Sequence, residues 1–223
     1  GLRRLEYRGY DSSGVASLSS DGRIERLRAE GKLKNLAAKL NANPLLGHIA
    51  IGHTRWATHG RPTEDNAHPH ATERVAVVHN GIIENYLEIK NKLIKEGHHF
   101  LSQTDTEVVP HLLQYYLRLE LERVGGSYEK IDFENNVLQK AVGDLEGTWA
   151  IVILFTHTPN KLYLCKNGSP LVIGIDDKFA LISSEQLPLS RYFNNYITLN
   201  NGDILTISKS EDGKIQFPDR KST

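Results

Sequence analysis

The first group of side chains that could bind or react lies in the segment His53-Thr54-Arg55-Trp56-Ala57-Thr58-His59-Gly60. This segment follows a short apolar run, Ile49–Gly52, which we expect to form a strand. A loop at a strand end is a common ligand site, because the sheet positions the loop while the loop supplies varied groups. Arg55 offers a planar fork of donors that suits a carboxylate or a phosphate, and Thr58 and His59 add polar contacts. We expect the polar stretch His53–His70 to be loop. A solvated loop with a structural Arg and Trp remains the alternative.

The second segment is His79-Asn80-Gly81, between an apolar strand predicted at Arg74–Val78 and a helix predicted at Ile82–Glu96. The helix follows from apolar residues at 3-4 spacing, and Gly97 ends it. Backbone N–H groups at a helix start, beside a side-chain amide, can stabilise a developing oxyanion, and glycine allows close approach. An ordinary strand-to-helix turn explains the same residues.

Thr104-Asp105-Thr106-Glu107 is the third segment, and it has the form of a capping box for a helix that runs to about Arg123. Capping alone explains the Asp and the two Thr residues. A functional Asp105 would leave capping to its neighbours and turn its carboxylate toward a cation, such as the α-ammonium of a substrate. Pro110 fits poorly inside the predicted helix, so we expect the helix either to start later or to bend there.

Two further kinds of site are disfavoured. The histidines have neither the i, i+4 spacing of a zincin motif nor a nearby Cys, so we expect no metal. Cys165 lies in an apolar strand segment with no base or helix start beside it, so we expect a structural thiol rather than a nucleophile. The histidines weighed as metal ligands are His53, His59, His68, His70 and His79.

The chain has 223 residues, 39% of them hydrophobic, and can bury a sizeable core. Lys plus Arg balances Asp plus Glu at 27 each, so no global charge attracts nucleic acid or an anionic membrane. One Cys excludes an internal disulfide framework and favours the cytoplasm. No apolar run is long enough to span a bilayer, and no signal peptide is recognisable.

The predicted elements suggest one domain of stacked sheets covered by helices. An Asp21-Gly22 hairpin signal joins two predicted strands, and Val137–Val142 suggests a further helix. The opening Gly1–Tyr10 resembles the middle of an amphipathic helix without its cap, and the chain contains no Met, so we expect a missing N-terminal segment. The remaining predictions are a helix at Leu33–Leu40 and strands at Val15–Ser20, Ile24–Arg28, Thr148–Phe155, Leu162–Cys165, Leu171–Ile175, Ala180–Ser183, Tyr196–Leu199 and Ile204–Ile207.

Read together, several motifs in order resemble one family: the glutaminase domain of glutamine–fructose-6-phosphate aminotransferase (isomerising), or glucosamine-6-phosphate synthase, a class II glutamine amidotransferase. The resemblance covers nearly the whole chain, and His-Thr-Arg-Trp-Ala-Thr-His-Gly is its most specific part. The motifs that carry it are Gly1–Gly14, His53–Gly60, Asn66–His70, Val78–Asn85, Ser102–Glu107 and Gly168–Gly174.

The resemblance implies an α/β (α+β) fold of the N-terminal-nucleophile hydrolase type, a four-layer α/β/β/α sandwich of two stacked, mainly antiparallel sheets. It also implies hydrolysis of the L-glutamine amide to glutamate and ammonia. In this family the nucleophile is an N-terminal Cys whose own α-amino group, with an ordinary pKa of about 8, acts as the base. A γ-glutamyl thioester forms and water cleaves it. No cofactor is implied.

Matching motifs assign roles by resemblance. Asn80 and Gly81 would form the oxyanion hole, Arg55 would hold the glutamine α-carboxylate, and Asp105 would hold the α-ammonium. Trp56 would lie at the pocket edge and gate the route by which ammonia leaves. The pocket lining would include Thr58, His59 and His68.

The nucleophile itself is expected upstream of Gly1, on a short strand that precedes a helix start, so residues 1–223 alone should hydrolyse no glutamine. The missing strand would leave a sheet edge unpaired. The family's sugar-isomerising domain, which binds fructose 6-phosphate and receives the ammonia for glucosamine 6-phosphate formation, is also absent from the chain. The full-length enzyme is expected to be a cytoplasmic homo-oligomer without nucleic-acid or membrane partners.

Three alternatives stay open. Another class II amidotransferase, such as glutamine phosphoribosylpyrophosphate amidotransferase or asparagine synthetase, would share the roles of Arg55, Asn80, Gly81 and Asp105. It would not share the sequences of Tyr7–Ser12 and His53–Gly60. A non-catalytic glutamine-sensing module would keep the pocket without a nucleophile. A His-rich metallohydrolase is the third.

Overall fold

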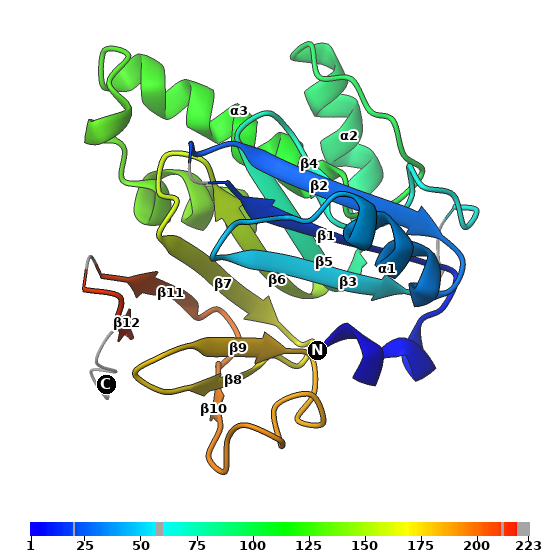
Figure 1. Ribbon diagram of the computed structural model, residues 1–223. Coiled ribbons are helices and arrows are strands. Elements are labelled where there is room, and N and C mark those ends of the chain that lie inside the picture. The colour runs from blue at the N-terminus through cyan, green and yellow to red at the C-terminus, as the bar shows by residue number, and fades with distance from the viewer. Residues whose placement is uncertain (20, 57–59, 211, 218–223) are drawn as a thin grey trace.

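A six-stranded antiparallel sheet forms the centre of the computed structural model, which describes residues 1–19, 21–56, 60–210 and 212–217 (Figure 1). Its strand order is β12-β11-β7-β6-β5-β4. The central strand β6 contains the longest apolar run of the chain because it is buried on both faces. The strands of this sheet are β4 (His70–Ala71), β5 (Val75–Ile83), β6 (Gly147–Phe155), β7 (Lys161–Asn167), β11 (Ile204–Lys209) and β12 (Ile215–Gln216).

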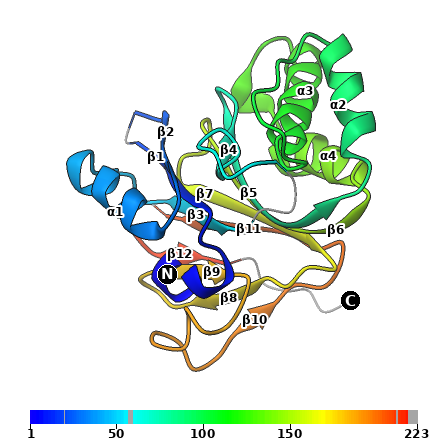
Figure 2. The same ribbon diagram turned by 90° about the vertical axis from the view of Figure 1, so that its right-hand side faces the viewer.

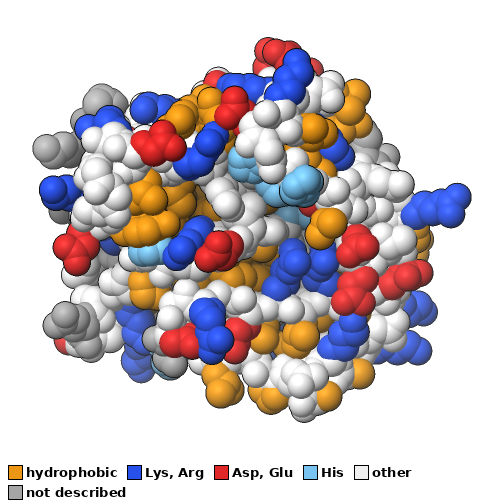
Figure 3. Space-filling view, turned by 90° about the horizontal axis from the view of Figure 1, so that it is seen from above, with side chains coloured by type: hydrophobic (Ala, Val, Ile, Leu, Met, Phe, Trp, Pro, Cys, Tyr) orange, Lys and Arg blue, Asp and Glu red, His pale blue; other side chains and the backbone are white. Residues whose placement is uncertain are grey.

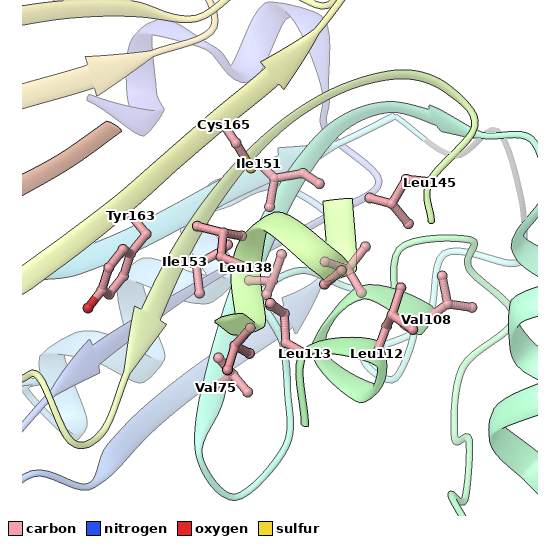
Figure 4. Close-up of a cluster of buried hydrophobic side chains, with 14 of the residues drawn as sticks. Val75, Val108, Leu112, Leu113, Leu138, Leu145, Ile151, Ile153, Tyr163 and Cys165 are labelled. Atoms are coloured by element: carbon pink, nitrogen blue, oxygen red, sulfur yellow. The ribbon is translucent and has the colours of Figure 1, made fainter. Parts of the chain in front are cut away.

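Helices cover one face of this sheet (Figure 2). They bury alternate residues of β5, β6 and β7 in the larger apolar core, whose side chains point toward one another in Figure 4. Leu113 of the long helix and Ile151 of the sheet are both fully buried there. The helical segments on this face are α2 (Tyr86–Lys95), α3 (Val108–Arg123), short turns at Tyr128–Lys130 and Phe133–Leu138, and α4 (Gln139–Gly143).

Two three-stranded sheets share the layer on the opposite face, with orders β2-β1-β3 and β10-β8-β9. Both contribute side chains to a second core against the central sheet, such as Ile51 from one and Ile173 from the other. The single helix α1 (Leu33–Ala42) then packs on the outer face of β1 and β2. The strands are β1 (Ser12–Leu18), β2 (Ile24–Glu30), β3 (Ala50–Arg55), β8 (Val172–Ile175), β9 (Ala180–Ser183) and β10 (Ile197–Thr198).

The order of layers is therefore helices, six-stranded sheet, two smaller sheets and helix, which confirms the predicted four-layer α/β/β/α sandwich (Figures 1 and 2). The second sheet layer differs from the prediction in one respect, since its described strands form two separate sheets. Charged side chains of both signs are mixed over the face seen in Figure 3, in keeping with the balanced charge. Within the described residues, no helix is both long and apolar enough to cross a membrane.

Four local predictions were wrong. The opening segment forms two 3₁₀ turns, Leu2–Arg4 and Glu6–Arg8, instead of part of an amphipathic α-helix. The segment His53–Arg55 is strand rather than loop, because its residues pair with the first residues of β1. The short pairing of His70 with Val77 likewise makes the end of the predicted loop a strand.

The third wrong prediction placed a strand-to-helix junction at His79-Asn80-Gly81. Strand β5 instead continues to Ile83, because Asn80 and Gly81 pair with Ala150 and Trp149 of β6. Sheet pairing overrides the local turn preference of Asn-Gly, and α2 starts only at Tyr86. The argument that a helix start creates an oxyanion site at Asn80 therefore fails, and any such site must be built from the strand.

The fourth was the capping box. Helix α3 starts at Val108, and neither Thr104 nor Glu107 caps it with its side chain. Glu107 instead accepts hydrogen bonds from the backbone N–H groups of Leu101 and Ser102, at 2.9 and 2.7 Å, so it fixes the turn before the helix. Pro110 lies in the first helical turn, where its missing N–H group costs nothing.

Candidate active site

A cavity of about 650 Å³ lies between the central sheet and the smaller sheets. The side chains of β3 and β9 line it from one layer, and those of β5 and β6 line it from the other. The described residues that the sequence singled out as a site and that line this cavity are Arg55, Trp56, His68, Asn80, Gly81 and Asp105. Segments distant in sequence thus converge on one space.

Arg55 is the last residue of β3 and is only 4% exposed. Its guanidinium group lies 3.7 Å from a carboxylate oxygen of Asp11 and donates to the backbone carbonyls of Gly60 and Arg61, both at 3.3 Å. Burial lowers the pKa of Arg55, and the nearby carboxylates of Asp11 and Asp105 act in the opposite direction. Arg55 therefore presents a buried, oriented positive charge to the cavity.

Asn80 and Gly81 lie in the second half of β5, at the cavity wall. Gly81 has φ +136°, and a Cβ atom at this position would collide with the backbone oxygen of Thr148. Only glycine fits a strand that approaches its neighbour in this way. The Asn80 side chain has no hydrogen bond to any described residue that would tie it into the fold. Its amide is therefore available to a molecule in the cavity.

Asp105 lies in the turn before α3, and its carboxylate is held from the side of β5. Its Oδ2 atom accepts a hydrogen bond from the Ile83 backbone N–H group at 2.9 Å. Glu107 fixes the turn from the other side, and its pKa is lowered to about 2. Burial opposes this shift, but the nearby His111 side chain and the hydrogen bonds from Leu101 and Ser102 outweigh it. Asp105 thus places a negative charge in the same cavity as Arg55.

A group of four histidines lies beside this turn; His68, His70 and His79 are buried and His53 is half-buried. His53 stacks on His68 with ring centroids 4.1 Å apart, and His70 packs edge-on against His68 at 4.9 Å. Burial lowers the pKa of His53 and of His70 to about 3, and it lowers the pKa of His68 and His79 as well, so all four are neutral at pH 7. Among the described residues, no three His, Cys, Asp or Glu side chains are grouped to hold a metal ion.

Three further predicted lining residues are Trp56, Thr58 and His59. Trp56 also lines the cavity; it is 60% exposed and contacts Tyr10 edge-to-face, with ring centroids 5.4 Å apart. Thr58 and His59, which were also predicted to line the pocket, lie outside the described residues.

Cys165 lies elsewhere, on β7, with its side chain in the core between the sheet and the helices (Figure 4). It is fully buried, and burial raises the pKa of its thiol. A thiol that stays protonated and has no access to the cavity is a poor nucleophile, as the sequence predicted.

Sequence reasoning missed several residues that hold the site together. Asn66 bonds to the Arg61 carbonyl at 2.9 Å and to the Gln103 N–H group at 2.8 Å, so it links the turn below Arg55 to the turn that carries Asp105. Arg26 and Arg28 of β2 donate to backbone carbonyls next to His68. Only the position of Asn66 inside a polar motif could have signalled such a role.

The sequence of residues 53–191 matches a family model described as a glutamine amidotransferase domain. The chain is 46% identical over 209 residues to a protein of Buchnera aphidicola subsp. Baizongia pistaciae and, over the same length, to one of Rhizobium meliloti. Both are named glutamine–fructose-6-phosphate aminotransferase [isomerizing]. The alignments cover 93% and 94% of this chain but only 33% and 32% of the relatives, so the chain spans about a third of their length.

Solved structures share the fold. Glutamine phosphoribosylpyrophosphate (PRPP) amidotransferase from B. subtilis, complexed with ADP and GMP, has a TM-score of 0.74 at 22% identity, with 97% of this chain and 45% of that chain covered. A glutamine aminotransferase class-II domain protein from Silicibacter pomeroyi has a TM-score of 0.60 at 16% identity, with 93% and 91% covered. Both solved structures thus share the overall fold of this chain.

Proposed function

This chain belongs to the glutamine amidotransferase domain family, and from that premise we propose that it binds L-glutamine in the cavity and hydrolyses the side-chain amide to glutamate and ammonia. One observation carries the proposal: the cavity brings together a buried cation, a buried carboxylate and a free side-chain amide. These are the groups needed for the two charges of an α-amino acid and for a reacting carbonyl oxygen.

The two charged ends of the substrate bind first in this proposal. Arg55 holds the α-carboxylate with paired N–H donors, and Asp105 accepts hydrogen bonds from the α-ammonium. Trp56 covers the edge of the pocket and controls the escape of ammonia. His68 lines the cavity, and we propose the same role for Thr58 and His59, which lie outside the described residues. The placement of Arg55, Asp105 and Trp56 around one cavity supports these roles.

The side-chain amide of glutamine then points toward Asn80 and Gly81. When a nucleophile attacks the amide carbon, negative charge develops on the carbonyl oxygen. The Asn80 side-chain N–H and the Gly81 backbone N–H donate to that oxygen in the proposed oxyanion hole. Support comes from the amide of Asn80, which is not tied into the fold, and from the close backbone approach that Gly81 allows.

The proposed nucleophile is a Cys on a segment N-terminal to Gly1. Its α-amino group takes the thiol proton, and the thiolate forms a C–S bond to the amide carbon, which gives the oxyanion. The resulting α-ammonium group returns the proton to the amide nitrogen, the C–N bond breaks, and ammonia leaves. Water then cleaves the γ-glutamyl thioester to give glutamate and regenerate the thiol. Cys165 is unsuited to this step because its protonated thiol is buried in the other core.

The shape of the cavity supports a place for that segment. Beyond the polar end near Arg55, apolar side chains line the space between β3 and β9, which are edge strands of two separate sheets. Gly1 and Leu2 lie at the cavity wall. We propose that an upstream strand enters between these edges and places the Cys beside Asn80, which would also complete the second sheet layer.

For the whole protein, we propose that ammonia passes to a second domain, which uses it to convert fructose 6-phosphate to glucosamine 6-phosphate. The names of the longer relatives support this proposal. We also propose that the full-length protein is a homo-oligomer located in the cytoplasm. Light scattering of the full-length protein and product analysis with fructose 6-phosphate test these parts separately from glutamine hydrolysis.

Labelling with a thiol-directed diazoketone analogue of glutamine tests the glutaminase proposal. Peptide mass spectrometry of the labelled full-length protein should find the adduct on a Cys upstream of Gly1, and excess glutamine should prevent its formation. An adduct on Cys165, or glutamine hydrolysis that continues in fully labelled protein, would contradict the proposed nucleophile.

A further inference from the structure

Thr106 lies at the centre of a buried polar cluster that joins three distant segments. Its hydroxyl oxygen is 2.9 Å from Nε2 of His68, which precedes β4, and 2.9 Å from Nδ1 of His79 on β5. Thr106 is 1% exposed, and both histidines are almost as deeply buried. Water therefore does not compete for these hydrogen bonds, and the three side chains fix one another.

The same hydroxyl reaches the carboxylate of Asp105. The distance from Thr106 Oγ1 to Asp105 Oδ1 is 3.4 Å, while Asp105 Oδ2 accepts from the Ile83 backbone N–H group at 2.9 Å. Both carboxylate oxygens thus have a donor on the protein side, and the plane of the carboxylate is defined by two contacts.

The donor and acceptor roles of the two ring nitrogens depend on the tautomer of each histidine, and hydrogen-bond accounting favours one arrangement. A threonine hydroxyl has one donor and two acceptor positions, and a neutral imidazole has one donor and one acceptor. Nδ1 of His68 and Nε2 of His79 are buried and make no hydrogen bond of normal geometry to a described residue, although the nearby Thr148 backbone acts to raise the pKa of His79. If Thr106 donated to either ring, that ring would carry its proton on the unpartnered nitrogen, and Asp105 Oδ1 would face hydroxyl lone pairs.

In the opposite arrangement, every donor proton of the three side chains has an acceptor. His68 donates from Nε2, His79 donates from Nδ1, and Thr106 donates its only proton to Asp105. Added protons would have to go to the two unpartnered nitrogens. Burial, which lowers the pKa of both imidazoles, acts in the same direction and keeps the rings neutral.

Fixing Asp105 matters because of the opposite charge nearby. Arg55 lies close enough for its charge to interact with that of Asp105, and Arg55 has its own carboxylate partner in Asp11. A carboxylate free to turn would be drawn toward the guanidinium, and the two charges would then neutralise each other instead of binding an amino acid.

We propose that Thr106, oriented by the neutral imidazoles of His68 and His79, is a positioning residue that directs Asp105 toward the α-ammonium of the substrate. This inference rests on the proposed function, in which that substrate is glutamine. Thr106 itself touches none of the reacting atoms; it acts through Asp105.

The first test compares Thr106→Val and Thr106→Ser in the full-length protein. Valine keeps the shape but removes the hydroxyl, so we expect KM for glutamine to rise roughly tenfold, since hydrogen bonds to charged groups are worth about that factor or more, with kcat changed less than about threefold. Serine keeps the hydroxyl and should restore KM to within about threefold of wild type. Thr206→Val is a matched control, because the Thr206 hydroxyl also donates to a carboxylate, that of Glu134, but lies on β11 outside the cavity.

The second test uses two ligands that differ only in the ammonium group, L-glutamate and glutarate, with binding measured by calorimetry. Thr106→Val should weaken glutamate roughly tenfold and leave glutarate unchanged, and in an Asp105→Asn background it should have little further effect. Equal weakening of both ligands, full additivity with Asp105→Asn, or no rescue by serine would overturn the inference.

The two tests separate this inference from the proposed function. Wild-type protein that shows the glutamate-selective effect of Thr106→Val but releases no ammonia from glutamine would contradict hydrolysis alone. Protein that hydrolyses glutamine but loses both ligands equally on Thr106→Val would contradict the role of Thr106 alone. Wild-type protein that binds neither ligand would contradict both.

Discussion

Replacement of Asn80 with alanine should separate catalysis from stability. No described hydrogen bond ties the Asn80 side chain into the fold, and the pairing of β5 with β6 at this position uses only backbone groups. The free energy of unfolding should therefore change by less than about 0.5 kcal/mol, as for substitutions away from structural features. Loss of one oxyanion-hole donor costs about 2.7–4 kcal/mol in the transition state, or roughly 10²–10³-fold in kcat.

Asn85 provides a matched contrast five positions along the chain. Its side chain donates to the Asp144 carbonyl at 2.8 Å and accepts from the Glu146 N–H group at 3.1 Å, so it ties the β5–α2 turn to the start of β6. Asn85→Ala removes two hydrogen bonds worth about 1 kcal/mol each and should lower stability by roughly 2 kcal/mol with kcat unchanged.

The assay is glutamate release under saturating glutamine, combined with urea unfolding of the same full-length variants. We expect Asn80→Ala to lose rate without losing stability, and Asn85→Ala to show the reverse. The reasoning is refuted if Asn80→Ala keeps at least a third of wild-type kcat, or if its rate falls only in proportion to a loss of folded protein.

Three further predictions concern Asp105, Cys165 and the buried histidines. Asp105→Asn removes the partner of the α-ammonium, which costs about 2 kcal/mol or more. KM for glutamine should therefore rise at least roughly 30-fold, with a smaller change in kcat. An unchanged KM in steady-state kinetics would contradict this prediction. Cys165→Ala should lower the free energy of unfolding by about 1 kcal/mol and leave glutaminase activity intact, so a dead but folded variant would contradict the structural role. His53 has a pKa of about 3 in the folded protein, against an ordinary value of 6.5. Between these two pH values the unfolded chain binds a proton at His53 that the folded chain does not. The free energy of unfolding therefore falls as the pH falls, by about 1.4 kcal/mol per pH unit for this group. His68, His70 and His79 act in the same direction, and urea unfolding that gives equal stability at pH 7 and pH 5.5 would contradict this.

Local sequence signals predicted much of the fold. The strand at Ala180–Ser183 matches to the residue, and Gly97 follows the end of α2 with φ +87°, because turn residues and apolar spacing act over a few positions. They failed where distant partners decide. Asn-Gly at positions 80–81 favours a turn locally, but Ala150 and Trp149 of β6 keep it in a strand.

The candidate site shows the same limit. Residue types and motif order pointed to Arg55, Asn80 and Asp105, and the structure places all three at one cavity. The supporting contacts could not be predicted, since the hydroxyl of Thr106 bonds to His68, 38 positions away, and local reasoning had assigned Thr106 to a helix cap. A capping motif and a buried hydrogen-bond centre use the same residue types, and only the tertiary contacts distinguish them.

The most direct test of the account is the glutaminase activity of two forms of the protein: residues 1–223 alone and the same chain extended upstream to its natural start. Ammonia and glutamate release by the extended form only, unaffected by Cys165→Ala, is the predicted result. Release of glutamate by residues 1–223, abolished by Cys165→Ala, would contradict the claim that the nucleophile enters the cavity from upstream of Gly1.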